Sequence, residues 1–169
     1  MNDTEISLLK QIDHANIIKL KEIIVSRPNK RNLFRGSTFL VFEYMDHDFA
    51  GLFKHKNKFA LPETKAIMKQ LLEGVAYLHR NKIMHRDIKS ANILMNDDGC
   101  VKLADFGLGR KVRFENFFTY KVVTLWYRAP ELLLGCKSYT DKIDVWSLGC
   151  VLVEFFTGEV LFRSKTYPI

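Results

Sequence analysis

Apolar residues recur along the chain in two different patterns, which predict a mixture of strands and helices. Residues 17–25 form an apolar, β-branched run with interleaved lysines, and residues 39–42 form a short continuous apolar run. Runs of this length are typical of strands, and we expect the second one to be buried. Residues 26–37, between the two runs, contain proline, asparagine and glycine, which indicate a loop. A short helical pattern over residues 3–12 precedes the first strand.

The later part of the chain predicts two longer helices separated by a short hairpin. Pro62 opens the first helix, because proline fits the first helical turn, where its missing N–H costs nothing. Residues 93–95 and 101–103 are two short strands joined by a hairpin turn at 96–99, and a second helix covers 141–156. Helical spacing predicts the buried faces of the two helices. They are Ile67, Leu71, Val75 and Leu78 in the first, and Val145, Leu148, Leu152 and Phe155 in the second.

These elements predict an α+β fold, in which a small sheet-containing part precedes a mainly helical one and the chemistry lies on the loops. The 169 residues, 47% hydrophobic and 27% charged, suffice for one buried core. No apolar run is long enough to cross a bilayer, so no membrane partner is expected. Three cysteines without paired spacing indicate reduced thiols in a nuclear or cytoplasmic protein. The net charge of +7 includes a basic loop at 27–35, but no interleaved aromatic residues support nucleic-acid binding there.

Three motifs in one order carry the candidate chemistry. They are His-Arg-Asp-Ile-Lys-Ser-Ala-Asn at 85–92, Asp-Phe-Gly at 105–107 and Ala-Pro-Glu at 129–131. A lone Asp-Phe-Gly arises by chance in many chains, so it would be weak evidence. The three motifs together, at workable separations, indicate the catalytic and activation loops of a phosphoryl-transfer enzyme.

Phosphoryl transfer requires positioning and charge stabilisation more than covalent help from the protein. Asp87 can receive or orient the incoming hydroxyl, and Lys89 can compensate the charge of the moving phosphoryl group. Asn92 and Asp105 supply hard oxygen ligands suited to Mg²⁺. An isolated residue of these types on a loop is usually a cap or a solvated side chain, but their joint spacing favours catalysis. His85, which follows two apolar residues, is interpreted as a packed structural residue.

The chain resembles the eukaryotic protein kinases and, more narrowly, the cyclin-dependent kinases. Residues 5–10 are similar to the end of their cyclin-contacting helix, residues 122–131 to the end of their activation segment, and residues 144–150 to their central C-lobe helix. The resemblance covers nearly every residue. Residues 42–48 and the basic loop before them are most similar to the transcription-associated branch, which acts on the repeated tail of RNA polymerase II.

The resemblance implies a serine/threonine kinase with ATP and Mg²⁺ as cofactors. Lys89 and Thr124 fit kinases that act on serine and threonine rather than tyrosine. Glu5 would be the helix carboxylate that pairs with an ATP-positioning lysine, and Asp105 would bind metal at the phosphates. The other implied ATP-site residues are a gatekeeper, two hinge residues that offer backbone groups, a ribose neighbour and a residue beneath the base. They are Phe42, Glu43 and Met45, Asp48, and Leu94, respectively.

The resemblance also implies how the kinase is activated and how it selects its substrate. Thr119 lies where the family carries an activating phosphothreonine, with Arg86 and Arg110 as partners of the phosphate. Val123 and Arg128 would turn a backbone carbonyl away from the residue that follows the target. Because proline has no N–H to leave unpaired there, Ser-Pro and Thr-Pro substrates are preferred. The expected partners are a cyclin-type regulatory subunit and such a protein substrate.

The family pattern predicts a bilobal fold that is incomplete in this chain. Residues 1–45 would be a partial N-lobe, without the glycine-rich loop and the lysine strand, and residues 46–169 a partial C-lobe that ends after the central helix. We expect the chain to be a fragment of a kinase, nuclear rather than cytoplasmic. The alternative is a catalytically impaired pseudokinase that binds a cyclin or a substrate. The implied hydrophobic spine, anchored by Asp144, comprises Leu9, Leu20, His85 and Phe106.

Overall fold

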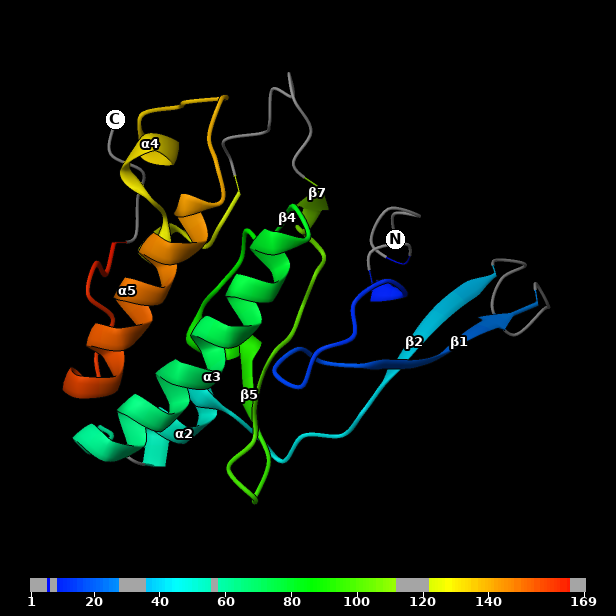
Figure 1. Cartoon of the computed structure of the whole chain (residues 1–169), viewed down its shortest axis with the longest axis horizontal. Coiled ribbons are helices and arrows are strands. Elements are labelled where there is room, and N and C mark those ends of the chain that lie inside the picture. The colour runs from blue at the N-terminus through cyan, green and yellow to red at the C-terminus, as the bar shows by residue number, and fades with distance from the viewer. Residues whose placement is uncertain (1–5, 7–8, 28–35, 56–57, 112–121, 165–169) are drawn as a thin grey trace.

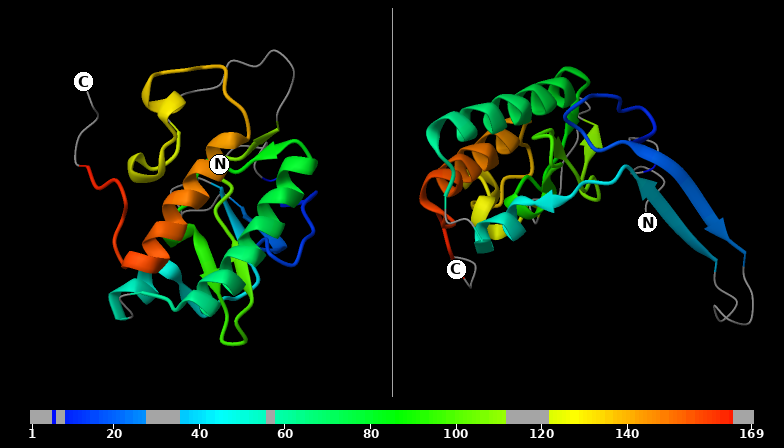
Figure 2. Two further views of the ribbon diagram at one scale, coloured as in Figure 1. Left: turned by 60° about the vertical axis from the view of Figure 1, so that its left-hand side comes forward. Right: turned by 90° about the horizontal axis from the view of Figure 1, so that it is seen from below.

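A two-stranded hairpin and a mainly helical body make up the described part of the chain. The computed structural model describes residues 6, 9–27, 36–55, 58–111 and 122–164. Strand β1 (Leu20–Ser26) pairs antiparallel with β2 (Ser37–Phe42). Figures 1 and 2 show that this hairpin projects away from the helices. The arrangement agrees with the predicted order of a sheet-containing part followed by a helical one.

The predicted strands at the start of the chain are present, with two corrections. The first begins at Leu20 rather than residue 17, because Ile17 forms a parallel bridge with Leu103 in the helical body. The run at 39–42 lies within β2 but is not buried, since Phe39 is 56% exposed. The apolar run therefore predicted the strand correctly. Its burial was predicted wrongly, because β1 and β2 form a two-stranded sheet within the described residues.

Helix α3 (Leu61–Arg80) confirms the prediction made from Pro62 and the apolar spacing. Its start is capped by Glu63, whose Oε2 accepts the backbone N–H of Ala60 at 2.7 Å. All four residues predicted for its inner face are buried: Ile67, Leu71, Val75 and Leu78. The helix is therefore held in place by the core along most of its length.

A three-stranded sheet lies beside α3, in the order β3 (His47–Asp48), β5 (Ile93–Met95) and β6 (Val101–Leu103). The predicted hairpin of β5 and β6 is confirmed at the expected bounds. Its turn ends at Gly99, whose φ of 79° suits glycine. Two further strands, β4 (Ile83–Met84) and β7 (Arg110–Lys111), pair with each other.

Helix α5 (Lys142–Thr157) has the predicted bounds to within one residue, and two of the four residues predicted for its inner face, Leu148 and Phe155, are buried. Val145 is 47% exposed, and Leu152 is only partly buried. The inward positions include three polar residues, Asp144, Ser147 and Glu154. Apolar residues lie on nearly all sides of this helix, so their spacing could not select a face.

Aromatic packing joins the helices into one core. Phe155 of α5 contacts Phe49 of α2 (Phe49–His55) with ring centroids 5.0 Å apart, and Phe59 at 5.5 Å. Helices α3 and α5 pack side by side, as Figure 1 shows. Helix α2 itself was not predicted. In the part of the chain that the structure describes, no helix is both long and apolar enough to cross a membrane.

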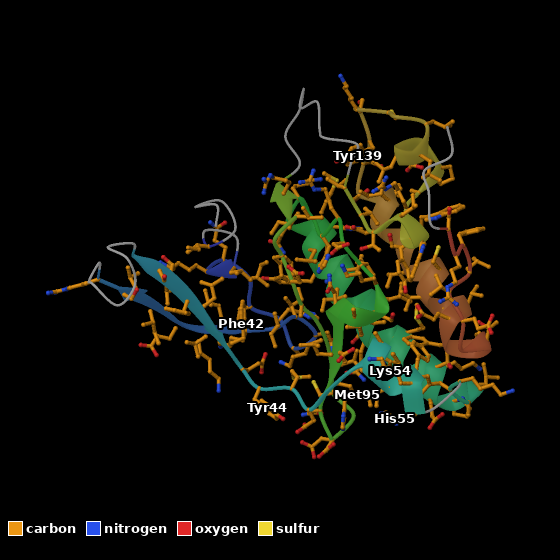
Figure 3. The ribbon with its side chains drawn as sticks, turned by 180° about the vertical axis from the view of Figure 1, so that it is seen from behind. Phe42, Tyr44, Lys54, His55, Met95 and Tyr139 are labelled. Carbon is orange, nitrogen blue, oxygen red and sulfur yellow. The ribbon has the colours of Figure 1, made fainter. Side chains whose placement is uncertain are left out.

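Shorter elements carry the loops that follow. The 3₁₀ helix η2 (Ser90–Asn92) leads into β5, the 3₁₀ helix η3 (Leu125–Tyr127) precedes Arg128, and α4 (Pro130–Leu133) follows. Figure 3 shows Phe42 on the hairpin and Tyr44 on the segment that runs from it towards the helical body, near Met95. The loops at 85–92, 104–109 and 122–129 lie against one another, since Ala104 donates its N–H to Asn92 and Thr124 donates its N–H to Asp87.

Candidate active site

A buried carboxylate on α5 holds the loop that contains the predicted catalytic residues. Asp144 is 1% exposed, and its two oxygens accept the backbone N–H groups of His85 and Arg86, each at 2.9 Å. Its Oδ2 also lies 2.9 Å from Nε2 of His79 on α3. Because charge-assisted bonds to a buried carboxylate are strong, they fix the start of the loop to two helices.

His85 is a packed structural residue, as the sequence predicted. Its ring is fully buried and lies 4.8 Å from the ring of Phe106, which agrees with the implied spine. Burial lowers the pKa of His85, against the opposing effect of Asp144. The neutral ring donates from Nε2 to the carbonyl of Ala104 (3.0 Å) and accepts the N–H of Asp87 at Nδ1 (3.2 Å).

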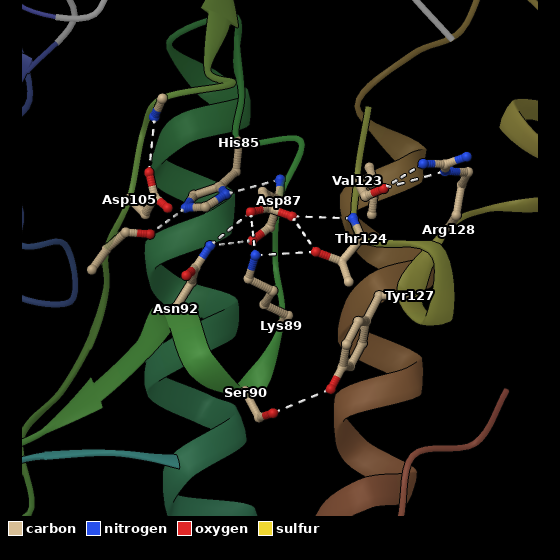
Figure 4. A network of polar contacts seen from close by, with 12 residues as sticks. His85, Asp87, Lys89, Ser90, Asn92, Asp105, Val123, Thr124, Tyr127 and Arg128 are labelled. Atoms are coloured by element: carbon tan, nitrogen blue, oxygen red, sulfur yellow. Dashed lines mark hydrogen bonds and ion pairs between the residues drawn. The ribbon is translucent and has the colours of Figure 1, made fainter. Parts of the chain in front are cut away.

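The side chain of Asp87 lies at the centre of the site (Figure 4). Its Oδ2 accepts bonds from Nζ of Lys89 at 2.7 Å and Nδ2 of Asn92 at 3.0 Å. Its Oδ1 accepts bonds from the hydroxyl and the N–H of Thr124, at 2.9 and 3.1 Å. Burial would raise the pKa of the Asp87 carboxyl, but Lys89 and Thr124 lower it below its ordinary value. The other two predicted catalytic residues, Lys89 and Asn92, thus donate to an ionised carboxylate.

The two predicted metal ligands lie on adjacent backbone segments. The N–H of Ala104, next to Asp105, donates to the carbonyl of Asn92 at 2.9 Å. The amide nitrogen of Asn92 is turned to Asp87, so its oxygen points the other way (Figure 4). Asp105 is exposed and accepts only the N–H of Gly107 among the described residues (3.2 Å). One amide and one carboxylate oxygen fit Mg²⁺, which needs few protein ligands when phosphates complete its shell.

Arg128 holds the carbonyl of Val123 in an unusual direction. The guanidinium donates to that oxygen from Nε at 3.2 Å and from Nη2 at 2.7 Å. Val123 has a φ of 66°, an outlier for a β-branched residue. Among the described residues, Arg86 (67°) and Asp105 (64°) of the site also have positive φ without being glycine, as does Lys82 (59°) just after α3. Strain of this kind accumulates where a site requires a fixed backbone.

The described residues predicted for the base and ribose lie on β2, β3, β5 and the segment 43–46 between β2 and β3. Asp48 pairs with Leu94 across β3 and β5, so these two residues are brought together. The Asp48 carboxylate accepts the N–H of Gly51 at 2.7 Å. Glu43 accepts the N–H of Lys19 (2.8 Å) and pairs with Lys102 (2.9 Å). Their contacts with ATP stay predictions, as does that of Phe42 and Met45.

The residues predicted for activation are described only in part. Glu5 and Thr119 lie outside the described residues. Arg86 is buried and donates to the carbonyl of Leu108 at 2.6 Å and to the hydroxyl of Tyr139 at 3.0 Å. Arg110 is paired across β4 and β7 with Met84, close to Arg86 in sequence. The structure therefore brings the two arginines to one region, and their phosphate-binding role stays a prediction.

Sequence reasoning missed a second polar group behind the loop. Ser90, Tyr127 and Glu154 are buried together and bonded to one another. A lone carboxylate in the apolar run Val-Leu-Val-Glu-Phe-Phe was the one signal that could have revealed it. Such a residue in a helix requires partners, because burying a charge without them is costly.

Comparisons with known proteins agree with this geometry. Residues 2–168 match the family model described as "Protein kinase domain". The chain is 46% identical to cyclin-dependent kinase C-3 of Oryza sativa subsp. japonica over 96% of its own length and 52% of that protein. It is 45% identical to human cyclin-dependent kinase 9, covering 96% of the chain and 45% of that protein. The chain thus spans about half the length of these curated relatives.

A solved structure gives the same answer for the fold. The crystal structure of the yeast RNA Pol II CTD kinase CTDK-1 complex contains a chain that matches with a TM-score of 0.88 and 42% identity. The match covers 97% of this chain and 52% of that one. The predicted kinase fold is thereby confirmed. Together with the loop described above, these matches show that the chain belongs to the protein kinase family.

Proposed function

We propose that the protein is a serine/threonine kinase of the cyclin-dependent type, which transfers the γ-phosphate of ATP to Ser-Pro and Thr-Pro sites. The observation that carries the proposal is the environment of Asp87. An ionised carboxylate, bonded to Lys89, Asn92 and Thr124, can accept a hydrogen bond from a substrate hydroxyl. Lys89, Asn92 and Thr124 also fix the orientation of the Asp87 carboxylate.

Each residue of the site has a defined part in this reaction. Asp87 orients the attacking hydroxyl and receives its proton. Lys89, 2.7 Å from that carboxylate and 3.1 Å from the Thr124 hydroxyl, places a positive charge where phosphate charge develops. Asn92 and Asp105 would hold Mg²⁺, which neutralises the phosphates of ATP when bound. Catalysis by this chain is therefore mainly positioning.

The proposed preference for proline comes from Val123 and Arg128. The Val123 carbonyl is occupied by the Arg128 guanidinium and cannot accept an N–H from the substrate residue after the target. A residue other than proline would leave its N–H unpaired, which costs about 1–3 kcal/mol. Proline carries no such group.

The finer proposals rest on the relatives. The name of the yeast complex specifies an RNA polymerase II tail kinase, which supports a similar substrate and a nuclear location here. The names of the curated relatives support a cyclin-type partner. We place the boundary between the N-lobe and C-lobe parts after residue 45, and we assign Thr119 as the activating phosphorylation site with Arg86 and Arg110 as its partners.

Phosphate transfer to a Ser-Pro peptide, measured with two matched protein variants, tests the proposal. The full-length protein with a cyclin-type subunit should phosphorylate a Ser-Pro peptide in the presence of Mg²⁺ and ATP. Asp87→Asn should abolish the reaction, because it removes the carboxylate, whereas Asp97→Asn in the exposed β5–β6 turn should not. If cyclin and peptide bind but no phosphate is transferred, the protein is a binding module instead. Equal rates for both variants would exclude Asp87 from catalysis.

A further inference from the structure

Three buried polar side chains meet behind the catalytic loop, each from a different element. Ser90 lies on η2, Tyr127 on η3 and Glu154 on α5. The Ser90 hydroxyl is 3.1 Å from Glu154 Oε1, the Tyr127 hydroxyl is 2.8 Å from Glu154 Oε2, and the two hydroxyls are 3.1 Å apart. Figure 4 shows the contact between Ser90 and Tyr127 directly below Lys89. The three side chains therefore form a closed triangle of hydrogen-bonding distances.

The number of available protons decides how many of these contacts are hydrogen bonds. Serine and tyrosine hydroxyls supply one proton each, and an ionised carboxylate supplies none. An ionised Glu154 therefore permits two bonds and leaves the third pair of oxygens without a proton between them. A neutral Glu154 adds a third proton, so that each of the three groups donates once and accepts once. Only the neutral acid satisfies the whole triangle.

The surroundings of Glu154 also disfavour a charge. Glu154 is only 5% exposed, and its carboxyl group forms no ion pair with any of the described residues. Lys89 is on the same loop as Ser90, but its ammonium group donates to Asp87 and Thr124 and not to Glu154. The titratable groups coupled to Glu154 are Tyr127 from η3 and Cys150 one turn earlier on α5, and neither carries a positive charge. A buried, unpaired carboxylate is costly.

Burial shifts the titration of these groups in the direction that this geometry requires. It raises the pKa of Glu154, although the hydrogen bonds from Tyr127 and Ser90 oppose the shift. It also raises the pKa of Tyr127, so the phenol stays a donor. The pKa of Glu154 is higher in the folded state than its ordinary value of 4.5. Its contribution to the free energy of unfolding is therefore full below pH 4.5 and is lost as the pH rises through the pKa of the folded state.

The triangle connects the two segments that must be in register for phosphate transfer. Ser90 is next to Lys89 and two residues from Asn92, and Tyr127 is next to Arg128. We propose that Glu154 is a neutral acid in the folded protein at neutral pH, and that its ring of hydrogen bonds with Ser90 and Tyr127 positions the catalytic loop against the substrate-recognition segment. These three are positioning residues, since none of them reaches the reacting groups.

Infrared spectroscopy of the full-length protein tests the proton directly. A protonated carboxyl has a carbonyl band that a carboxylate lacks. We expect this band at neutral pH in the unmodified protein, its disappearance as the pH is raised, and its absence in Glu154→Gln. Glu73→Gln, which changes an exposed carboxylate on α3, should keep the band. No band at neutral pH, or a band that survives Glu154→Gln, would overturn the neutral acid. The titration of the unmodified protein does not depend on any variant folding.

Kinetics test the positioning role, and this part rests on the proposed kinase function. Tyr127→Phe and Ser90→Ala should each lower kcat about tenfold, the equivalent of one lost hydrogen bond, without changing the KM for Mg-ATP. The double variant should be no worse than the more damaging single one, because both break the same ring. Glu154→Gln should retain more activity than Glu154→Leu, since an amide both donates and accepts. The control is Tyr77→Phe, because the Tyr77 hydroxyl accepts the N–H of Asp13 and, among the described residues, makes no contact with the ring.

The two measurements separate the possible failures. If the unmodified protein transfers no phosphate, the proposed function fails and the infrared band still decides the state of Glu154. If it is active and the ring variants keep the kcat of Tyr77→Phe, the positioning role is wrong. A loss of kcat equal in Glu154→Gln and Glu154→Leu would also contradict the ring.

Discussion

The selectivity of the proposed kinase depends on one guanidinium group. In Arg128→Met the side chain keeps much of its apolar length but loses both donors that hold the Val123 carbonyl at 3.2 and 2.7 Å. A β-branched residue at a φ of 66° carries about 1–3 kcal/mol of backbone strain, which then has nothing to hold it. The carbonyl should therefore turn back and accept the N–H of the incoming substrate.

The size of the effect follows from the bond that the substrate gains. An unpaired N–H costs about 1–3 kcal/mol, so the unmodified protein should prefer a Ser-Pro peptide over the matching Ser-Ala peptide by about 5- to 150-fold in kcat/KM. Arg128→Met should reduce this ratio to nearly one, mainly by improving the use of Ser-Ala. Arg80→Met, which removes an exposed charge from the end of α3, should leave the ratio unchanged.

The assay is a comparison of initial rates for the two peptides with the full-length protein and its cyclin-type subunit. A ratio, unlike a rate, does not change when a variant is only partly folded. If Arg128→Met lowers both rates by the same factor and keeps the preference, the Val123 carbonyl is not the source of selectivity.

Three further predictions concern the scaffold. Asp144→Asn should lower the free energy of unfolding by about 3–5 kcal/mol in urea titrations, because an amide cannot accept all three bonds made by the buried carboxylate. A loss below about 1 kcal/mol would contradict the anchoring role of Asp144. Phe155→Ala should cost about 3–5 kcal/mol, whereas the exposed neighbour Phe156→Ala should cost much less, and equal losses would refute the aromatic core. Burial lowers the pKa of His85 below 6.5, so the stabilising effect of its neutral ring is present above pH 6.5 and declines as the pH falls. NMR should show the ring still mainly neutral at pH 6.5, and a charged ring at that pH would refute this prediction.

The fold was predictable wherever one period dominates the local sequence. Helix α3 has a polar face and an apolar face, so its buried side followed from spacing and its start from Pro62. Helix α5 is apolar nearly all round, and its inner face is set by polar residues with specific partners, such as Glu154. Spacing does not record those partners. Phe39 was wrongly expected to be buried, because a strand's composition does not say whether another layer covers it.

The site was predictable in its members but not in all of its contacts. Asp87, Lys89 and Asn92 lie within six residues, so one motif gave all three. The bonds from Thr124 join segments 37 residues apart, so residue spacing does not predict them, although the family resemblance had singled out Thr124. Ser90 was invisible for the same reason, since its partners come from two other elements.

The anchoring of the loop by Asp144 has a consequence for how the protein opens. The amide hydrogens of His85 and Arg86 point at a carboxylate that solvent hardly reaches. Loops usually exchange their amide hydrogens quickly through local fluctuations. These two can exchange only when α5 separates from the rest of the body, so in hydrogen–deuterium exchange they should be as slow as the interior of the helices. The loop at 85–92 should thus belong to the same cooperative unit as the core, and its opening should require the body to unfold.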